Sequence, residues 1–527
     1  MQIIVRNIRM PISASDREVM EQALKRLAPL IDKKDIENRS IFRRSVDTRH
    51  KTITIVYSVL IETVLSVSQS RLAELDCAVL EDSYDINGLE SGDETSVGRP
   101  VIVGFGPCGM FAALLLAEKG YRPIVLERGD SVLVRANKVR RFLTTGVLDT
   151  ETNIQFGAGG AGTFSDGKLV TRINDKRCRY ILERFVEFGA PRDILVNAKP
   201  HIGTDKLLAV VSNIDRRIRE LGGEIHYNTK LTGIEFCGKR AAFVVTNNGK
   251  IPCGQLILAV GHSARDTYAF LMKNGFDIVP KPFSVGVRIE HLRADIEKAI
   301  FKDQAGNPKL GHAEYALSKR VGDDCVYSFC MCPGGEVIAA ASEEGGVVTN
   351  GMSKFKRDGI NSNSAIAVSV APENPIEFQR QIERDAFRLG GGDYSAPVQT
   401  VGDFLSGKWG TEPSRIFPTY MNGRVKTADL STLFPQRVTD MLKLGIKSFN
   451  SNINGFSCSD AVLTGAETRT SSPVRILRSE VFLALGFDNI YPCGEGAGYA
   501  GGITSAAVDG LRCAEAVIAR YMPTRGT

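Results

Sequence analysis

The chain has 527 residues, of which 43% are hydrophobic and 24% charged, and its formal net charge is +6 at pH 7. This length predicts two to four domains, and so small a charge, without a dense Lys/Arg tract, argues against nucleic-acid binding. The eleven cysteines follow no regular spacing, the first residues lack the pattern of a signal peptide, and no apolar run approaches the ~20 residues that span a bilayer. We therefore expect a cytoplasmic protein without a membrane span or a disulfide framework.

Residues 1–92 are predicted to form a small α+β accessory domain. Residues 1–11 resemble a strand, residues 13–27 begin with Ser and Asp capping candidates and continue with apolar residues at helical spacing, and residues 52–64 are rich in β-branched side chains. The stretch ESGDETSVGRP, residues 90–100, is polar and contains glycine and proline. Such a composition is typical of a linker.

The remainder is predicted to be α/β, with a discontinuous Rossmann-like domain that encloses an inserted domain. Residues 101–129 have the pattern of a strand, a glycine turn, an apolar helix and a second strand, which is a βαβ unit. The first part of this domain is assigned to residues 97–282 and the last part to residues 441–527. Residues 283–440 lose the βαβ rhythm and are expected to form a mixed-β cap over a substrate pocket.

The first glycine cluster has the spacing of a dinucleotide-binding turn. Gly104, Gly106 and Gly109 form G-x-G-x-x-G directly after the apolar strand residues 101–103. The first glycine makes the turn, the second lets the backbone reach a pyrophosphate, and the third lets the helix pack on the strand. Glu127 ends the next predicted strand, about where an acid binds ribose hydroxyls. This context predicts a nucleotide site and leaves FAD and NAD as alternatives.

A second strand, glycine turn and helix are predicted almost 400 residues later, in YPCGEGAGYAGGITSAAVDG, residues 491–510. Ligands of doubly wound sheets bind at the carboxyl ends of the strands, so both glycine turns belong at the same edge. FAD is long enough to need both. Glu495 is placed to bind a ribityl hydroxyl or to lie near the pyrophosphate, and the helix that begins near Gly502 would point its amides at the flavin. We therefore expect one shared FAD site.

Most of residues 95–527 resembles the poorly characterised family of FAD-dependent, or NAD(FAD)-utilising, dehydrogenases of the glutathione-reductase-like superfamily. The resemblance is carried by VGFGPCGMFAALLLA, FGAGGAGTFSDGKLVTR, LAVGHSARDTY, FCMCPGG, VVTNGMS, GAETRTSSPVRI and CGEGAGYAGGITSAAVDG. The chain departs from the family pattern at Ala158, where relatives carry an acid. The resemblance implies FAD contacts at Gly104, Gly106, Pro107, Gly109, Glu127, Arg128, Gly160, Gly162, Ser165, Gly261, Gly494, Glu495, Gly502, Ile503 and Thr504.

Three side chains are candidates for chemistry, each with a structural alternative. Lys168 is placed to stabilise a reduced, anionic flavin, or it is a solvated loop lysine. His262 is a candidate base or a structural histidine. Cys332, with Cys330 in a C-x-C before a glycine turn, is a candidate redox-active thiol or a buried strand cysteine. A structural zinc site typically needs four ligands and no second pair is suitably spaced, so we expect no metal.

Arg288 and Arg469 are candidates for binding an anionic substrate, because a guanidinium fork suits carboxylates and phosphates; their alternative is structural ion pairing. The C-x4-C pair of flavin disulfide reductases is absent, which argues against disulfide reduction. No second G-x-G-x-x-G follows, so NAD(P)H is expected only as an external electron donor. We expect an FAD-dependent oxidoreductase that transfers a hydride between a small, unidentified substrate and flavin N5. The alternatives are a flavin-dependent RNA-modifying protein that uses residues 1–92 for RNA contact, and a flavin-binding protein without turnover.

Overall fold

Strands from both ends of the chain lie in one parallel sheet in this computed structural model, which describes residues 1–50, 52–81 and 84–523. The order across this sheet is β23 (Ile490–Pro492), β11 (Gln255–Leu258), β5 (Pro100–Val103), β6 (Ile124–Leu126) and β7 (Glu224–His226). All four pairings are parallel. Read from β7, the order is 3-2-1-4-5, which is that of a doubly wound dinucleotide-binding sheet. The predicted α/β class is confirmed.

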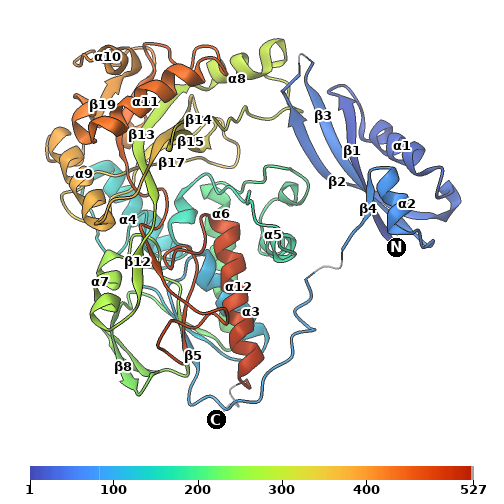
Figure 1. Ribbon diagram of the computed structural model, residues 1–527, viewed down its shortest axis with the longest axis horizontal. Helices are drawn as coiled ribbons and strands as arrows, with labels where there is room; N and C mark the ends of the chain where they lie inside the picture. Colours follow the sequence, from blue (N-terminus) through green and yellow to red (C-terminus); the bar gives the residue numbers. More distant parts are fainter. Residues whose placement is uncertain (51, 82–83, 524–527) are drawn as a thin grey trace.

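Two helices that follow the glycine turns pack side by side (Figure 1): α3 (Pro107–Glu118) and α12 (Ile503–Arg520). Their close approach depends on glycine. A Cβ at Gly510 of α12 would lie 2.2 Å from the Cys108 carbonyl oxygen of α3. Glycine also lets α3 pack on its own turn, since a Cβ at Gly109 would lie 1.9 Å from the Gly104 carbonyl oxygen. Helix α3 is buried on all sides, which explains why its sequence is apolar throughout.

The rest of this Rossmann-like region surrounds the parallel sheet. Its further helices are α4 (Val132–Thr145), α5 (Arg177–Glu187), α6 (Thr204–Glu220) and α7 (Arg265–Lys273). A small antiparallel sheet is formed by β8 (Leu231–Cys237), β9 (Arg240–Thr246) and β10 (Gly249–Pro252), and one further pair is β12 (Ile278–Pro280) with β22 (Val474–Ile476).

A seven-stranded mixed sheet forms the cap. Its order is β14 (Ser318–Val321), β15 (Asp324–Cys332), β18 (Asn361–Val370), β13 (Phe283–Leu292), β21 (Val462–Glu467), β19 (Ala396–Thr400) and β20 (Val425–Thr427). The strand β13 is buried over nearly its whole length, as befits the centre of a sheet covered on both faces. Beside it lie β16 (Glu336–Ala339), β17 (Thr349–Met352), α8 (Arg293–Phe301), α9 (Pro375–Leu389), α10 (Val401–Ser406) and α11 (Gln436–Phe449). The sheet thus includes β21, beyond the predicted boundary at residue 440.

The N-terminal unit stands to one side of the molecule (Figure 1). Its sheet has the order β2 (Ile36–Asp47), β3 (Thr54–Thr63), β1 (Gln2–Pro11) and β4 (Cys77–Val79), with helices α1 (Asp16–Leu27) and α2 (Gln69–Glu74). Buried and half-buried residues alternate along β3, so one face of the sheet packs on a core and the other is more open. Ser15 and Glu18 form a capping box that fixes the start of α1.

Within the described residues, no helix is both long enough and apolar enough to cross a membrane.

Candidate functional site

A cavity of about 370 Å³ lies where both glycine turns meet the cap. Its walls come from the two turns, the loop 155–170, the segment 259–264 after β11, and the cap strands β15, β17 and β21. Volumes of about 300–1,000 Å³ are typical of small-molecule sites. The prediction that the two ends of the chain share one site is therefore matched by the geometry of this cavity.

The first glycine turn brings bare backbone to the cavity. Gly104 has φ +104°, and a Cβ there would lie 2.5 Å from the Ala259 carbonyl oxygen, so glycine is required on both counts. Gly106 is the N-cap of α3 and offers no side chain to satisfy the first amides of the helix. Gly106 also lies against Gly160, which lines the same cavity. The N-terminus of α3 is thereby left open to a ligand.

A second helix N-terminus opens on the same cavity. Helix α12 begins at Ile503 after Gly502, which has φ +120° and likewise provides no capping side chain. Gly501, Gly502 and Ile503 all line the cavity. Helix N-termini carry a partial positive charge and unsatisfied N–H groups, so two of them at one cavity favour an extended ligand with more than one electron-rich group.

Glu127 ends β6 and is almost completely buried at the cavity wall. Its carboxylate accepts hydrogen bonds from the N–H groups of Phe105 (2.9 Å), Gly129 (2.9 Å) and Gly157 (3.0 Å). A carboxylate has about four lone-pair sites, so Glu127 retains acceptor capacity for a ligand hydroxyl while it holds three loops in place.

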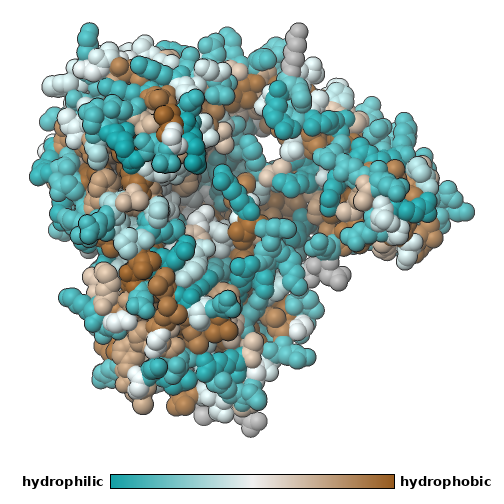
Figure 2. Space-filling model, viewed as in Figure 1, coloured by the Kyte–Doolittle hydropathy of each residue, from teal (hydrophilic) through white to brown (hydrophobic). Residues whose placement is uncertain are grey.

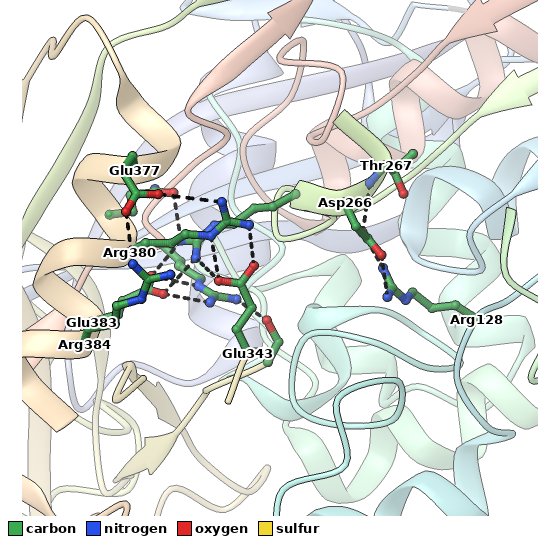
Figure 3. A network of polar contacts seen from close by, with 12 residues as sticks. Arg128, Asp266, Thr267, Glu343, Glu377, Arg380, Glu383 and Arg384 are labelled. Carbon is green, nitrogen blue, oxygen red and sulfur yellow. Dashed lines mark hydrogen bonds and ion pairs between the residues drawn. The ribbon is translucent and has the colours of Figure 1, made fainter. Parts of the chain in front are cut away.

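Arg128 lines the cavity with its charge already neutralised by neighbours. Its guanidinium makes a two-pronged ion pair with Asp266 at 3.0 Å (Figure 3), a further pair with Glu151, and lies 4.1 Å from the ring centre of Phe156. These contacts join the loop after β6 to the start of α7. They fix the position of Arg128 beside the cavity.

Arg135, for which no sequence motif predicts a role, supports the glycine-rich loop through hydrogen bonds to its backbone. This fully buried α4 residue donates hydrogen bonds to the carbonyl oxygens of Asn153, Ile154, Gly157, Ala158 and Gly160. Burial lowers the pKa of Arg135 to about 10. Arg135 thereby holds this stretch of loop in the shape that faces the cavity.

Glu495 and His262 meet at the cavity, 4.0 Å apart between Oε1 and Nε2. Burial raises the pKa of Glu495 to about 7, against the lowering effect of the Gly502 N–H. Burial, with the nearby Arg469 and Arg265 guanidiniums, lowers the pKa of His262 to about 3. His262 is therefore neutral at physiological pH, and so low a pKa makes it a weak base.

Lys168 lines the cavity opposite the α12 N-terminus segment, with its ammonium 4.0 Å from Asp166. Asp166 is itself ion-paired with the buried Arg357. Ser165 donates a hydrogen bond to the Gly162 carbonyl oxygen at 2.7 Å and accepts one from the Gly167 N–H at 3.0 Å, so it shapes the loop that carries Lys168. Lys168 therefore lines the cavity with a side chain that is only 25% exposed.

The two cysteines of the C-x-C differ in position. Cys330 lines the cavity, whereas Cys332 is fully buried behind it. Arg288 is also fully buried and lies outside the cavity lining. Its guanidinium makes five hydrogen bonds, to Glu467, Asn363, Asn350 and the Cys330 carbonyl oxygen. No donor of Arg288 remains for a substrate, so its observed role is to anchor the cap strands.

Arg469 does reach the cavity, and a buried ion network holds it there. Its guanidinium pairs with both carboxylate oxygens of Glu383, at 3.1 and 3.0 Å, and Arg265 pairs with the same carboxylate. Figure 3 shows the outer part of this network, in which Glu343 bridges towards Arg380. A third donor of Arg469 bonds the Ser342 hydroxyl, so two of its five N–H groups make none of these contacts.

The cavity collects most of the residues selected from the sequence. Those that line it are Gly104, Gly106, Pro107, Glu127, Arg128, Gly160, Gly162, Ser165, Lys168, Gly261, His262, Arg469, Glu495, Gly502 and Ile503. Those that do not are Gly109, Arg288, Cys332, Gly494 and Thr504. Gly494 packs on Cys108, and Thr504 donates a hydrogen bond to the Leu169 carbonyl oxygen at 2.8 Å, so both support the wall from behind.

Several lining residues were not selected, among them Phe329, Cys330, Asn350, Glu467 and Thr470. They come from the cap, where the sequence shows strands but no ligand-binding turn. The C-x-C was the only signal in this group; Cys332 was selected from it, and Cys330 is the member that lines the cavity.

The residues present fit FAD. Two uncapped helix N-termini suit the pyrophosphate and the electron-rich edge of the flavin ring, and Gly106 and Gly160 present bare backbone to the same cavity. Glu127 and Glu495 offer carboxylates for hydroxyl groups. Phe329 and Ile503 offer apolar surface in the part of the cavity that adjoins the cap.

Comparison with known proteins agrees with this fit. A family model described as "FAD-dependent protein, C-terminal domain-like" matches residues 282–470, and a domain of unknown function, DUF8436, matches residues 1–62. The first match confirms the predicted cofactor, FAD, at the level of the family, and the predicted oxidoreductase class agrees with it because flavins are redox cofactors. Two finer predictions stay predictions: that the protein is a dehydrogenase, and that it belongs to the glutathione-reductase-like superfamily.

Two solved enzyme structures align with this chain at low similarity. Glycine oxidase from Bacillus cereus ATCC 14579 is 10% identical with a TM-score of 0.33, covering 80% of this chain and 94% of that one. The glycerol-3-phosphate dehydrogenase from Bacillus halodurans, complexed with FAD, is 10% identical with a TM-score of 0.34, covering 81% of this chain and 65% of that one. Similarity at this level transfers no residue role and no substrate.

An uncharacterized protein from Clostridium beijerinckii (strain ATCC 51743 / NCIMB 8052) is 44% identical over 538 residues, which cover 99% of each chain. The chain therefore belongs to the family of this Clostridium beijerinckii protein.

Proposed function

We propose that the protein is an FAD-dependent oxidoreductase of the glutathione-reductase-like superfamily, which transfers a hydride between a small substrate and flavin N5. The observation that carries this proposal is the convergence of two uncapped helix N-termini, those of α3 and α12, on one cavity. A bound flavin supplies two-electron chemistry that amino-acid side chains lack.

The residues of the chain divide the work of binding. The Gly104–Gly106 turn and the N-terminus of α3 would hold the pyrophosphate, and Glu127 would accept hydrogen bonds from a ribose. The α12 N-terminus and the Lys168 ammonium would stabilise negative charge that develops on the flavin during reduction. Arg469, with two N–H groups left, would orient an anionic substrate, and NAD(P)H would serve as an external electron donor.

A single methyl group tests the binding site. The Gly106→Ala variant should fold, because φ at Gly106 is −82° and the added Cβ would meet only Gly160 Cα, at 3.7 Å. That methyl group would nevertheless occupy space at the N-terminus of α3, where we propose that the pyrophosphate binds. We expect at least a tenfold weaker affinity for FAD, with the melting temperature of the flavin-free protein unchanged.

The measurement is FAD titration followed by flavin absorbance and fluorescence. The exposed Gly88→Ala is the matched control, because its Cβ would meet nothing closer than 3.9 Å and Gly88 is remote from the cavity. Reduction of the bound flavin by NADH or NADPH, followed at its visible band, then tests the electron donor. Wild-type protein that never takes up FAD would overturn the proposal, as would undiminished binding by Gly106→Ala.

A further inference from the structure

Cys330 and Cys332 lie at an irregularity in the cap strand β15. The pairing of β15 with β18 shifts between Phe329 and Cys332, which marks a β-bulge, and Cys330 has φ +45°. A left-handed conformation is uncommon outside glycine, asparagine and aspartate, and bulges re-aim side chains beside active sites. Here the bulge turns Cys330 into the cavity while Cys332 stays buried behind it.

The two thiols are within reach of each other. Residues i and i+2 of a regular strand have Cα atoms about 6.6–6.8 Å apart, within the 4.4–6.8 Å that a disulfide spans. The Cys332 thiol donates a hydrogen bond to the Cys330 carbonyl oxygen at 3.3 Å, and the two thiols are close enough to interact. The structure holds both residues as free cysteines.

Glycines leave the space in which Cys332 sits. A Cβ at Gly351 would lie 2.9 Å from the Cys332 sulfur, and a Cβ at Gly335 would lie 2.9 Å from the Cys332 Cβ. Arg288 anchors the same bulge by donating to the Cys330 carbonyl oxygen at 3.0 Å. The position of the pair is thus built by residues from three further strands or turns, which a solvent-facing cysteine would not need.

The charges around Cys330 favour its thiolate. The hydrogen bond from Cys332 lowers the pKa of Cys330 most, and the Arg288 and Lys168 cations lower it further, against burial and Asp166. The same coupling raises the pKa of Cys332. By contrast, burial raises the pKa values of Cys108, Cys493 and Cys513, which pack together between α3 and α12. Thiolates are the reactive form, so the C-x-C stands apart from the other buried cysteines.

We propose that Cys330 and Cys332 are a redox-active dithiol of the cavity, with Cys330 as the attacking thiol, Cys332 as the resolving thiol, and a disulfide as the substrate class. This inference rests on the proposed function, in that the flavin is the two-electron partner of the dithiol. The pair of the known flavin disulfide reductases lies beside the first glycine turn; here the pair comes from the cap instead.

The exchange balances without an external oxidant. The Cys330 thiolate attacks one sulfur of R–S–S–R′, so a Cys330–S–S–R bond forms and R′–S⁻ leaves. The Cys332 thiolate then attacks the Cys330 sulfur, which forms the Cys330–Cys332 disulfide and releases R–S⁻. The two protein thiol protons pass to the leaving thiolates, the substrate gains two electrons, and the dithiol loses two. A reduced flavin in the cavity would supply two electrons and two protons to restore the dithiol.

The test is a redox titration of the full-length purified protein. Samples are equilibrated with mixtures of reduced and oxidised dithiothreitol, quenched in acid with N-ethylmaleimide, and digested with trypsin. The chain has no Lys or Arg between Arg320 and Lys354, so one peptide, residues 321–354, contains Cys325, Cys330 and Cys332. We expect three labels under reducing conditions, and under oxidising conditions one label, on Cys325, with a disulfide joining the other two.

Three variants separate the roles, with 5,5′-dithiobis(2-nitrobenzoic acid) as the probe disulfide. Cys332→Ser should trap a stable mixed disulfide on Cys330. Cys330→Ser should lower the rate of exchange at this peptide at least tenfold. Cys325→Ser, on the same strand and facing away from the cavity lining, is the matched control and should behave as wild type.

Three labels at every redox ratio would overturn the inference, and so would exchange in Cys330→Ser at the wild-type rate. The visible flavin band is recorded in the same samples. A flavin band without the disulfide contradicts the dithiol alone, whereas the disulfide in protein that takes up no FAD contradicts the proposed function alone.

Discussion

Burial moves the pKa values of Glu495 and His262 in opposite directions, although the two side chains are neighbours at the cavity. Burial disfavours the charged form of each group, so it raises the pKa of an acid and lowers that of a base. At neutral pH the His262 imidazole carries no charge, and Glu495 is near its midpoint. The structure therefore favours Glu495 over His262 as the titrating group of this cavity.

The stability of the flavin-free protein should depend on the protonation of Glu495. Because the pKa in the folded state is raised from the ordinary 4.5 to about 7, the protonated carboxyl stabilises the fold below pH 4.5, and this contribution is lost as pH rises through 7. We expect Glu495→Gln to gain stability relative to wild type by up to about 3 kcal/mol between pH 5 and pH 8.

Urea denaturation of the flavin-free proteins at both pH values measures this difference. Glu373→Gln, at an exposed acid remote from the cavity, is the control and should give the same difference at pH 5 and pH 8. A Glu495→Gln variant whose stability runs parallel to wild type across this range would show that Glu495 titrates as an ordinary carboxyl.

Helix α9 of the cap is tied to the flavin-binding region by one carboxylate. Glu383 of α9 receives Arg265 from the start of α7 and Arg469 from the segment after β21. Against the raising effect of burial, these two guanidiniums lower the pKa of Glu383. Removing one partner of a buried network leaves uncompensated charge, which costs far more than loss of a surface pair.

Glu383→Gln should therefore destabilise the protein by about 3–5 kcal/mol at pH 7. Because the folded-state pKa is depressed, the contribution of Glu383 is present above pH 4.5 and is lost as pH falls below it, so the gap between variant and wild type should narrow in acid. Denaturation at pH 7 and pH 4 gives both values.

Glu377→Gln on the same helix is the matched control, because its exposed pair with Arg384 (Figure 3) should contribute less than about 1 kcal/mol. If Glu383→Gln costs no more than Glu377→Gln at pH 7, the buried network does not join the cap to the flavin-binding region.

At the scale of the whole molecule, the N-terminal unit is attached through few contacts. Arg44 of β2 exchanges backbone hydrogen bonds of 2.9 Å with Val196 and Ala198, and Lys309 donates to the Ala14 carbonyl oxygen at 2.8 Å. The surface of the unit is largely hydrophilic, and Figure 2 shows a gap between part of it and the rest of the molecule. Of the described residues, none before Val103 lines the cavity.

Deletion of residues 1–80 should thus leave the flavin site intact. We expect an FAD affinity within twofold of the full-length protein and the same visible spectrum, because every cavity wall comes from later segments. FAD titration of both chains is the measurement. Loss of flavin binding by the shortened chain, with its circular dichroism otherwise native, would show that the N-terminal unit shapes the cavity.

The flavin-binding half of the fold could be predicted from local sequence. Gly104, Gly106 and Glu127 stand in a short βαβ unit whose spacing is dictated by one ligand, so the pattern is compact enough to detect. The C-terminal boundary of the cap was harder to predict. Strand β21 pairs with β13, which lies more than 170 residues earlier, and nothing in the sequence around residue 440 indicates that the chain re-enters the cap sheet there. Non-local pairing leaves no local signal.

The side chains that the cap contributes to the site were also hard to predict from local sequence. Arg288 was selected as a substrate ligand because arginine forks suit anions, yet the fold gives all its donors to Glu467 and its neighbours. Cys332 was selected, whereas the member of the C-x-C that lines the cavity is Cys330, at the register shift of β15. Arg135 gave no signal at all, since its five carbonyl partners are loop backbone brought beneath α4 only by folding.

By itself, the sequence determined the two glycine turns and the helices that follow them, and it predicted that both turns belong to one site, because glycine spacing and helix starts are local properties. Only the tertiary structure decided which side chains of the cap line the cavity between the turns. A one-residue bulge or a distant ion pair sets the direction of a side chain, and both depend on contacts between segments far apart in the chain.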